Sequence, residues 1–174
     1  MSQENSRAKG APIQVLVTYG SKRGGTAELA QMLADGLREE GLTVAVLRPE
    51  RVKHLDHFDA VIVGGALYAF RWHKSARRFV LRHARELRSR PTYFFSSGPL
   101  DNSATTKEIP PTKGVSALMK RVGACGHATF GGRLSPDATG LTASKMAKRH
   151  SGDWRDPAHV RLWAKTVASR LQET

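Results

Sequence analysis

The sequence is poor in several features that define other classes of protein. Its 174 residues include a single cysteine, which excludes a disulfide framework and a cysteine-rich metal site. Acidic residues are scarce: 15 Asp and Glu stand against 28 Lys and Arg, a formal net charge of +13. No apolar run approaches the roughly 20 residues that cross a bilayer, and residues 1–12 lack the apolar core of a secretory signal. We therefore expect a cytoplasmic protein with a basic surface, free or peripheral at a membrane.

Several catalytic signatures are also absent. The sequence contains no H-E-x-x-H, C-x-x-C or G-x-S-x-G pattern, so metalloprotease, dithiol and α/β-hydrolase chemistry are unsupported. No metal site is expected. The length is that of one domain, which we place at residues 13–174 after a polar tail over residues 1–12.

Short apolar runs alternate with amphipathic segments along the chain. The pattern predicts strands over 13–19, 42–47, 57–66, 92–97 and 124–131, and helices over 26–40, 74–88, 115–122 and 156–171, with a loop over 103–112. Strands that alternate with helices indicate a mostly parallel sheet covered on both faces. Five such strands fit an α/β three-layer sandwich with strand order 2-1-3-4-5.

The loop after the first strand is rich in small and hydroxyl residues. It reads Tyr19-Gly-Ser-Lys-Arg-Gly-Gly-Thr26 and leads directly into a predicted helix. Backbone N–H groups at a helix N-terminus favour a phosphate, and the hydroxyl groups of Ser21 and Thr26 add donors. The loop lacks the Gly-Lys-Ser/Thr ending of a P-loop and the Rossmann G-x-G-x-x-G. It indicates a phosphate site of another kind, or a glycine-rich turn that only caps the helix.

The hydroxyl-rich loop ending at Thr26 resembles the phosphate loop of flavodoxins. Later segments narrow the resemblance to flavodoxin-domain proteins related to the menaquinone-dependent protoporphyrinogen oxidase. They are Val63-Gly-Gly-Ala-Leu67, Trp72-His73, Phe79-Val80, His83-Ala84, Tyr93–Ser97 followed by Gly98-Pro-Leu, Phe130-Gly-Gly-Arg-Leu134 and Gly152-Asp-Trp-Arg-Asp156. The resemblance covers residues 13–171. It implies a flavodoxin-like α/β sandwich with a five-stranded parallel sheet in order 2-1-3-4-5.

The resemblance also implies an FMN cofactor. The phosphate is expected among Ser21, Lys22, Arg23, Gly24, Gly25 and Thr26, and the ring between the loops 66–72 and 97–101; the residues expected there are Ala66, Leu67, Tyr68, Phe70, Trp72, Ser97, Gly98, Pro99 and Asp101. The implied role is that of an FMN-dependent oxidoreductase, in one form protoporphyrinogen-oxidase-like, or an electron-transfer protein. Its partner would be a redox protein or a quinone.

Three aromatic residues alternate along the loop after the third strand. In an extended loop Tyr68, Phe70 and Trp72 would point to one side, and we expect Tyr68 or Trp72 to stack on the flavin; packing on neighbouring loops is the alternative. Ser96, Ser97 and Gly98 would offer donors to the polar edge of the ring, or form a turn that binds no ligand. Other polar residues allow two interpretations. Asp101 either caps the next segment or meets a cation, and His73 either binds a substrate carboxylate or caps a helix.

His127 and Cys125 fall on a predicted core strand, where we expect them only to fill space. Basic side chains recur on one face of the segment 74–88. Lys74, Arg78, Arg82 and Arg85 are spaced by four, four and three residues, as on an exposed helix face. Such a face attracts an acidic redox protein or an anionic membrane surface, or is merely solvated; nucleic acid is not an expected partner. The alternative function is a flavin-free flavodoxin-like module that binds an anionic partner through this face.

Overall fold

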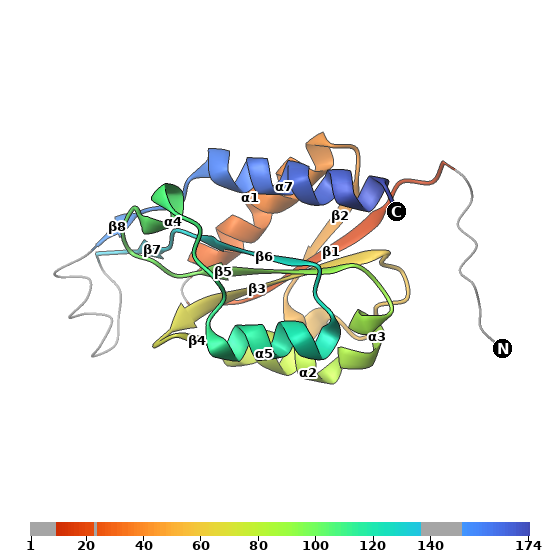
Figure 1. Ribbon diagram of the computed structural model, residues 1–174, viewed down its shortest axis with the longest axis horizontal. Coiled ribbons are helices and arrows are strands. Elements are labelled where there is room, and N and C mark those ends of the chain that lie inside the picture. Colours follow the sequence, from red (N-terminus) through yellow and green to blue (C-terminus); the bar gives the residue numbers. More distant parts are fainter. Residues whose placement is uncertain (1–9, 23, 137–150) are drawn as a thin grey trace.

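The computed structural model describes residues 10–22, 24–136 and 151–174 and is built on a central parallel sheet (Figure 1). Its strands are β1 (Gln14–Gly20), β2 (Thr43–Leu47), β3 (Ala60–Tyr68), β5 (Thr92–Ser97) and β6 (Gly126–Phe130). They are hydrogen-bonded in the order β2-β1-β3-β5-β6. This confirms the predicted order 2-1-3-4-5, because β4 (Arg71–Trp72) is a hairpin arm that pairs antiparallel with β3 and adds no parallel strand.

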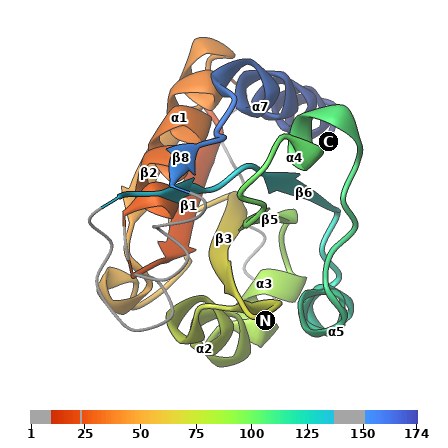
Figure 2. The ribbon, with the colours of Figure 1, turned by 90° about the vertical axis from the view of Figure 1, so that its left-hand side faces the viewer.

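Helices cover both faces of the sheet (Figure 2). One layer holds α1 (Gly25–Glu39) and α7 (Pro157–Gln172), and the other holds α2 (Lys74–Arg82), α3 (Ala84–Arg88) and α5 (Lys113–Val122). Successive strand residues point to opposite faces. Val15, Val17 and Ile62 therefore pack in the core under α1 and α7, whereas Leu16 and Val61 pack under α2 and α5. Burial on both faces explains why the strands are nearly continuous apolar runs.

The segment predicted as one helix over 74–88 is two helices. The break falls at His83, whose ψ of 17° lies outside the α-helical region. Its ring packs on Phe79 with 4.8 Å between centroids, and its Nδ1 lies 2.7 Å from Glu86 Oε1. A buried imidazole that bonds a carboxylate three residues ahead thus marks the break.

Four further short elements differ from prediction. The loop predicted over 103–112 begins with α4 (Ser103–Thr106), and the chain also forms the 3₁₀ turn η1 (Pro49–Arg51). Near the end of the chain, β7 (Arg133–Leu134) pairs antiparallel with β8 (Gly152–Asp153). No helix in the described residues is long and apolar enough to cross a bilayer.

The connection from β3 to β4 is a two-residue hairpin turn rather than an extended loop. Tyr68 pairs with Arg71, and Ala69 and Phe70 have φ angles of 47° and 64°. These are the angles of a type I′ turn, which matches the twist of hairpin strands. The expectation that alternating aromatics share one side of an extended loop is therefore wrong. Each non-glycine residue in this conformation costs about 1–2 kcal/mol.

Candidate functional site at the carboxyl ends of the strands

A cavity of about 360 Å³ opens at the carboxyl ends of the parallel strands. Ligands of open α/β sheets bind at this edge, where the strand order reverses. The loops after β1, β3, β5 and β6 all contribute to the wall. Its lining residues are Ser21, Gly25, Thr26, Ala66, Leu67, Tyr68, Ala69, Ser97, Gly98, Leu100, Gly132, Arg133 and Leu134.

The hydroxyl-rich loop forms one end of this cavity. Ser21 and Thr26 are 6% and 2% exposed and both line it. Gly24 takes a left-handed conformation with φ of 80° and caps α1, which begins at Gly25. The N-terminus of α1 therefore lies at the cavity, as predicted for this loop, whereas Lys22 and Gly24 are next to lining residues but do not line the cavity themselves. Arg23 lies outside the described residues.

Tyr68 reaches from the end of β3 to this loop. Its hydroxyl oxygen accepts a hydrogen bond from the backbone N–H of Lys22 at 3.2 Å, and Lys22 Nζ lies 5.8 Å from the centre of its ring. The loop thus already holds an oxygen atom against a backbone donor.

An arginine pair lies beside the loop. Arg133 lines the cavity and donates to Glu28 Oε1 at 2.9 Å, and its Cβ lies against Gly25. Arg155 bridges the same Glu28 and Asp153, and this pairing raises the pKa of the guanidinium. Sequence reasoning missed Arg133, because its approach to the loop depends on the β7–β8 pairing. The spacing of Gly131-Gly132-Arg133 after the last parallel strand was the available signal.

The walls farther from this loop are mainly apolar. Leu67 and Ala69 come from the β3–β4 hairpin, and Ser97, Gly98 and Leu100 follow β5. A Cβ added at Gly98 would lie 2.9 Å from Leu67 Cδ1, so glycine allows the two loops to approach. The Gly98 N–H donates to Phe130 O at 3.2 Å. The expectation that this donor is available to a ring is therefore wrong, whereas Ser97 keeps its place in the wall.

Besides Lys22 and Gly24, four residues predicted around the ring lie outside the lining set. Trp72 is 3% exposed, donates from Nε1 to Ser96 Oγ at 2.8 Å and packs in the core under α2 and α5. The structure thus makes Trp72 a core residue rather than a wall of this cavity. Phe70 is exposed at the hairpin turn, and the carbonyl oxygen of Pro99 accepts a hydrogen bond from Gly132 N at 2.8 Å. Asp101 accepts from Ser103 N at 2.8 Å, and hydrogen bonding by the side chain and then the backbone of Ser103 lowers the pKa of its carboxyl.

The two open interpretations of polar residues resolve toward capping. Asp101 accepts from the N–H of Ser103, the first residue of α4, although Asn102 holds the N-cap position. His73 is the N-cap of α2, where its Nδ1 accepts from Ser75 N at 3.4 Å. Burial, with Lys22 and Lys74, lowers the pKa of His73.

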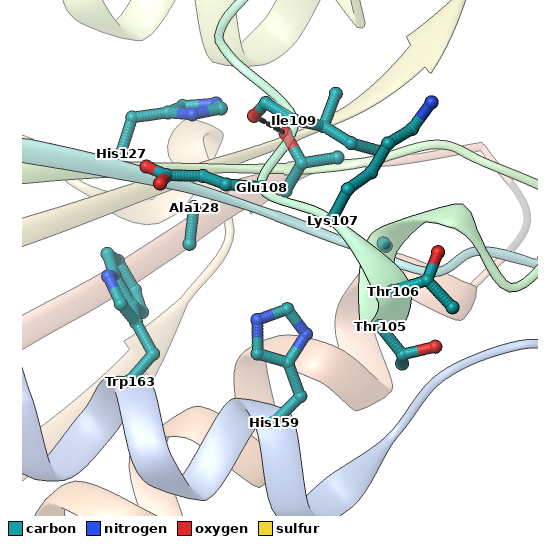
Figure 3. A pocket seen from close by; sticks show the side chains of 11 residues that line it. Thr105, Thr106, Lys107, Glu108, Ile109, His127, Ala128, His159 and Trp163 are labelled. Atoms are coloured by element: carbon teal, nitrogen blue, oxygen red, sulfur yellow. Dashed lines mark hydrogen bonds between the residues drawn. The ribbon is translucent and has the colours of Figure 1, made fainter.

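A second cavity of about 390 Å³ lies at the β6 edge of the sheet (Figure 3). His127 points to the opposite side of β6 from His159 and Trp163, and its Nε2 lies 2.9 Å from Ser96 Oγ. Burial lowers the pKa of His127 to about 4. The expectation that His127 and Cys125 only fill the core is wrong, because His127 lines a cavity and Cys125 is exposed.

The first cavity, not the second, suits a flavin mononucleotide. It combines a helix N-terminus and two hydroxyl groups at one end with leucine walls at the other, and none of its lining residues is acidic. Its volume is typical of small-molecule sites. A dianionic phosphate at one end and a flat apolar ring at the other match this donor set.

A parallel α/β sandwich with this site at its switch point defines an FMN-dependent, flavodoxin-like flavoprotein with a redox role. A family model described as the flavodoxin domain matches residues 16–149. The chain belongs to this flavodoxin domain family.

Individual relatives agree with this assignment. Protoporphyrinogen IX dehydrogenase [quinone] of Escherichia coli strain K12 is 29% identical over 86 residues. That match spans about half the length of each protein, 48% of this chain and 48% of the relative.

Solved structures share the fold. The rubredoxin oxygen:oxidoreductase of Desulfovibrio gigas superposes with a TM-score of 0.64 at 16% identity, covering 95% of this chain and 38% of that one. A flavodoxin from the domain Archaea gives 0.60 at 14% identity, covering 92% and 99%. At these identities the likeness shows the fold alone.

Proposed function

We propose that the chain binds FMN in the 360 Å³ cavity and serves as an oxidoreductase that passes electrons to a quinone. The observation that carries the proposal is the pairing of a phosphate-suited loop with apolar walls in one cavity. Bound flavin would supply the one- and two-electron chemistry, and the protein would supply orientation and electrostatics.

The residues at the loop end would hold the phosphate. Ser21 and Thr26 would donate from their hydroxyl groups, and Lys22 would donate from its backbone N–H after releasing Tyr68. Arg133 adds a positive charge beside Gly25. Its bond to Glu28 keeps the guanidinium near the loop, where it can neutralise part of a dianion.

The residues at the apolar end would position the ring. Leu67, Ala69 and Leu100 supply apolar lining to the cavity, and Tyr68 lines it as well. Leucine walls exclude water from a bound ring and strengthen its remaining polar contacts. Ser97, which is 6% exposed and lines the cavity, would hydrogen-bond a polar edge of the ring.

The choice of a quinone follows from the E. coli relative, whose name includes both a porphyrinogen and a quinone. Protoporphyrinogen is the corresponding candidate electron donor. An acidic redox protein is the second candidate partner, favoured by the exposed basic side chains of Lys74, Arg78, Arg82 and Arg85. The flavin-free alternative does not account for the hydroxyl groups lining the cavity.

The test is an anaerobic reoxidation experiment. Protein loaded with FMN is photoreduced and mixed with a water-soluble naphthoquinone, and flavin absorbance is followed in time. We expect bound flavin to be reoxidised with saturation in quinone concentration, which indicates a binding step. A rate that rises linearly and is no faster than that of free reduced FMN would argue against a quinone site.

A further inference from the structure

The tip of the β3–β4 hairpin carries an exposed aromatic side chain. Phe70 is 82% exposed, and it takes the second position of the type I′ turn with φ of 64°. Asparagine and glycine are the residues that suit this position. A phenylalanine there strains the backbone and buries almost nothing, so folding does not account for it. A role in binding another molecule does account for an exposed phenylalanine at this position.

Basic side chains lie close to this tip. Arg71 is the next residue and is exposed, Lys74 is exposed at the start of α2, and Lys22 Nζ lies 5.8 Å from the ring centre of Tyr68 in the same hairpin. The positive charge continues along α2 through exposed residues, namely Arg77, Arg78 and Arg82. Within the described chain, no ion pair neutralises Arg71, Lys74 or these three arginines.

The hairpin also borders the flavin cavity. Tyr68 and Ala69 line that cavity, and Phe70 follows them directly. In Figure 1 the β3–β4 hairpin points to the same side of the molecule as β7 and β8. Whatever binds the tip therefore lies next to the cavity mouth.

We propose that this tip, with the basic side chains around it, docks on an anionic lipid bilayer, with Phe70 in the boundary between headgroups and acyl chains. The inference rests on the proposed function, because it brings the cavity to the layer in which apolar quinones dissolve. One apolar anchor and a polybasic surface are the two signals that together hold a protein on a membrane. A stable protein partner needs about 1,000 Å² of complementary surface, and a single projecting side chain is a poor centre for it.

The test measures binding of FMN-loaded full-length protein to sedimenting vesicles. Vesicles of mixed phosphatidylglycerol and phosphatidylcholine are compared with vesicles of phosphatidylcholine alone. We expect binding to the anionic vesicles only, weakened by added salt. The variant Phe70→Asn should lower the partition coefficient about tenfold or more, while its melting temperature stays equal or rises, because asparagine tolerates a positive φ. Each basic residue changed to glutamine should weaken partition about fivefold.

Leu162→Asn is the matched control, since Leu162 is 67% exposed on α7, in the opposite helix layer. It should bind vesicles like the wild type. The proposal would be overturned if Phe70→Asn bound vesicles like the wild type, or if the wild type did not bind anionic vesicles. Capture of an acidic redox protein through Phe70 without vesicle binding would assign the tip to a protein partner instead. An FMN titration of the same samples distinguishes a failure of membrane docking from a failure of the flavin site.

Discussion

Removal of the two hydroxyl groups in the phosphate loop should weaken FMN binding severely. In the double variant Ser21→Ala, Thr26→Val each side chain keeps its approximate size, so the buried loop retains its packing. A hydrogen bond to a charged group is worth about 1.5–3 kcal/mol. Two such bonds correspond to a rise in Kd of about 10²–10⁴-fold.

The assay is titration of FMN by fluorescence, with far-UV circular dichroism to confirm that the variant is folded. The control variant Thr166→Val, Ser169→Ala makes the same chemical changes on the exposed face of α7. It should bind FMN like the wild type. If the loop variant also binds FMN within threefold of the wild type, the loop does not hold the phosphate.

Three further changes test other parts of the structure. Trp72→Ala should lower the free energy of unfolding by about 3–5 kcal/mol, because the ring is buried and bonds Ser96; a loss below 1 kcal/mol in urea denaturation would contradict its core role. Burial lowers the pKa of His127 to about 4 in the folded protein, so between pH 6.5 and 4 the unfolded chain binds a proton at this residue and the folded chain does not. The free energy of unfolding should therefore fall as the pH is lowered from 6.5 to 4, and His127→Gln should flatten that decline. A pH profile of stability that is the same in the variant and the wild type would refute this prediction. Replacing Arg78, Arg82 and Arg85 by glutamine should slow electron transfer with an anionic partner at low salt by about 10-fold or more, without changing FMN affinity; an unchanged rate and salt slope in stopped-flow mixing would show a merely solvated face.

The sheet and its strand order were predictable because the strands are buried on both faces. Residues 15–17 and 60–66 lack polar side chains, which is typical of parallel strands under two helix layers. The phosphate loop was predictable for a related reason. Its small and hydroxyl residues fall directly between a strand and a helix, so position and chemistry agree.

The hairpin was not predictable from local signals. A type I′ turn is usually predicted from an Asn-Gly or Asp-Gly pair, and Ala69-Phe70 is neither. Without that signal the segment 68–72 reads as extended, and Trp72 falls on the same side as Tyr68. The turn instead folds Trp72 back over Gly65, where a Cβ would lie 2.6 Å from the indole. Only glycine at that position leaves room for the ring.

Arg133 illustrates a second limit of sequence reasoning. Its place beside Gly25 depends on pairing between Arg133 and Asp153, which are distant in sequence. The break at His83 has a local origin instead, since it coincides with a side-chain hydrogen bond between His83 and Glu86 that the helical pattern of apolar residues does not reveal. Such side-chain contacts do not alter the periodic pattern of apolar residues from which helices and strands are predicted.

The most direct test of the account is to map FMN on the protein by two-dimensional NMR of backbone amides. We expect that adding FMN shifts the amide signals of residues 21–26, 66–69, 97–100 and 132–134 in a saturable way. The amide signals of the β6-edge cavity, such as those of Glu108 and His159, should not move. Shifts centred on the β6-edge cavity, or no shifts at saturating FMN, would contradict it.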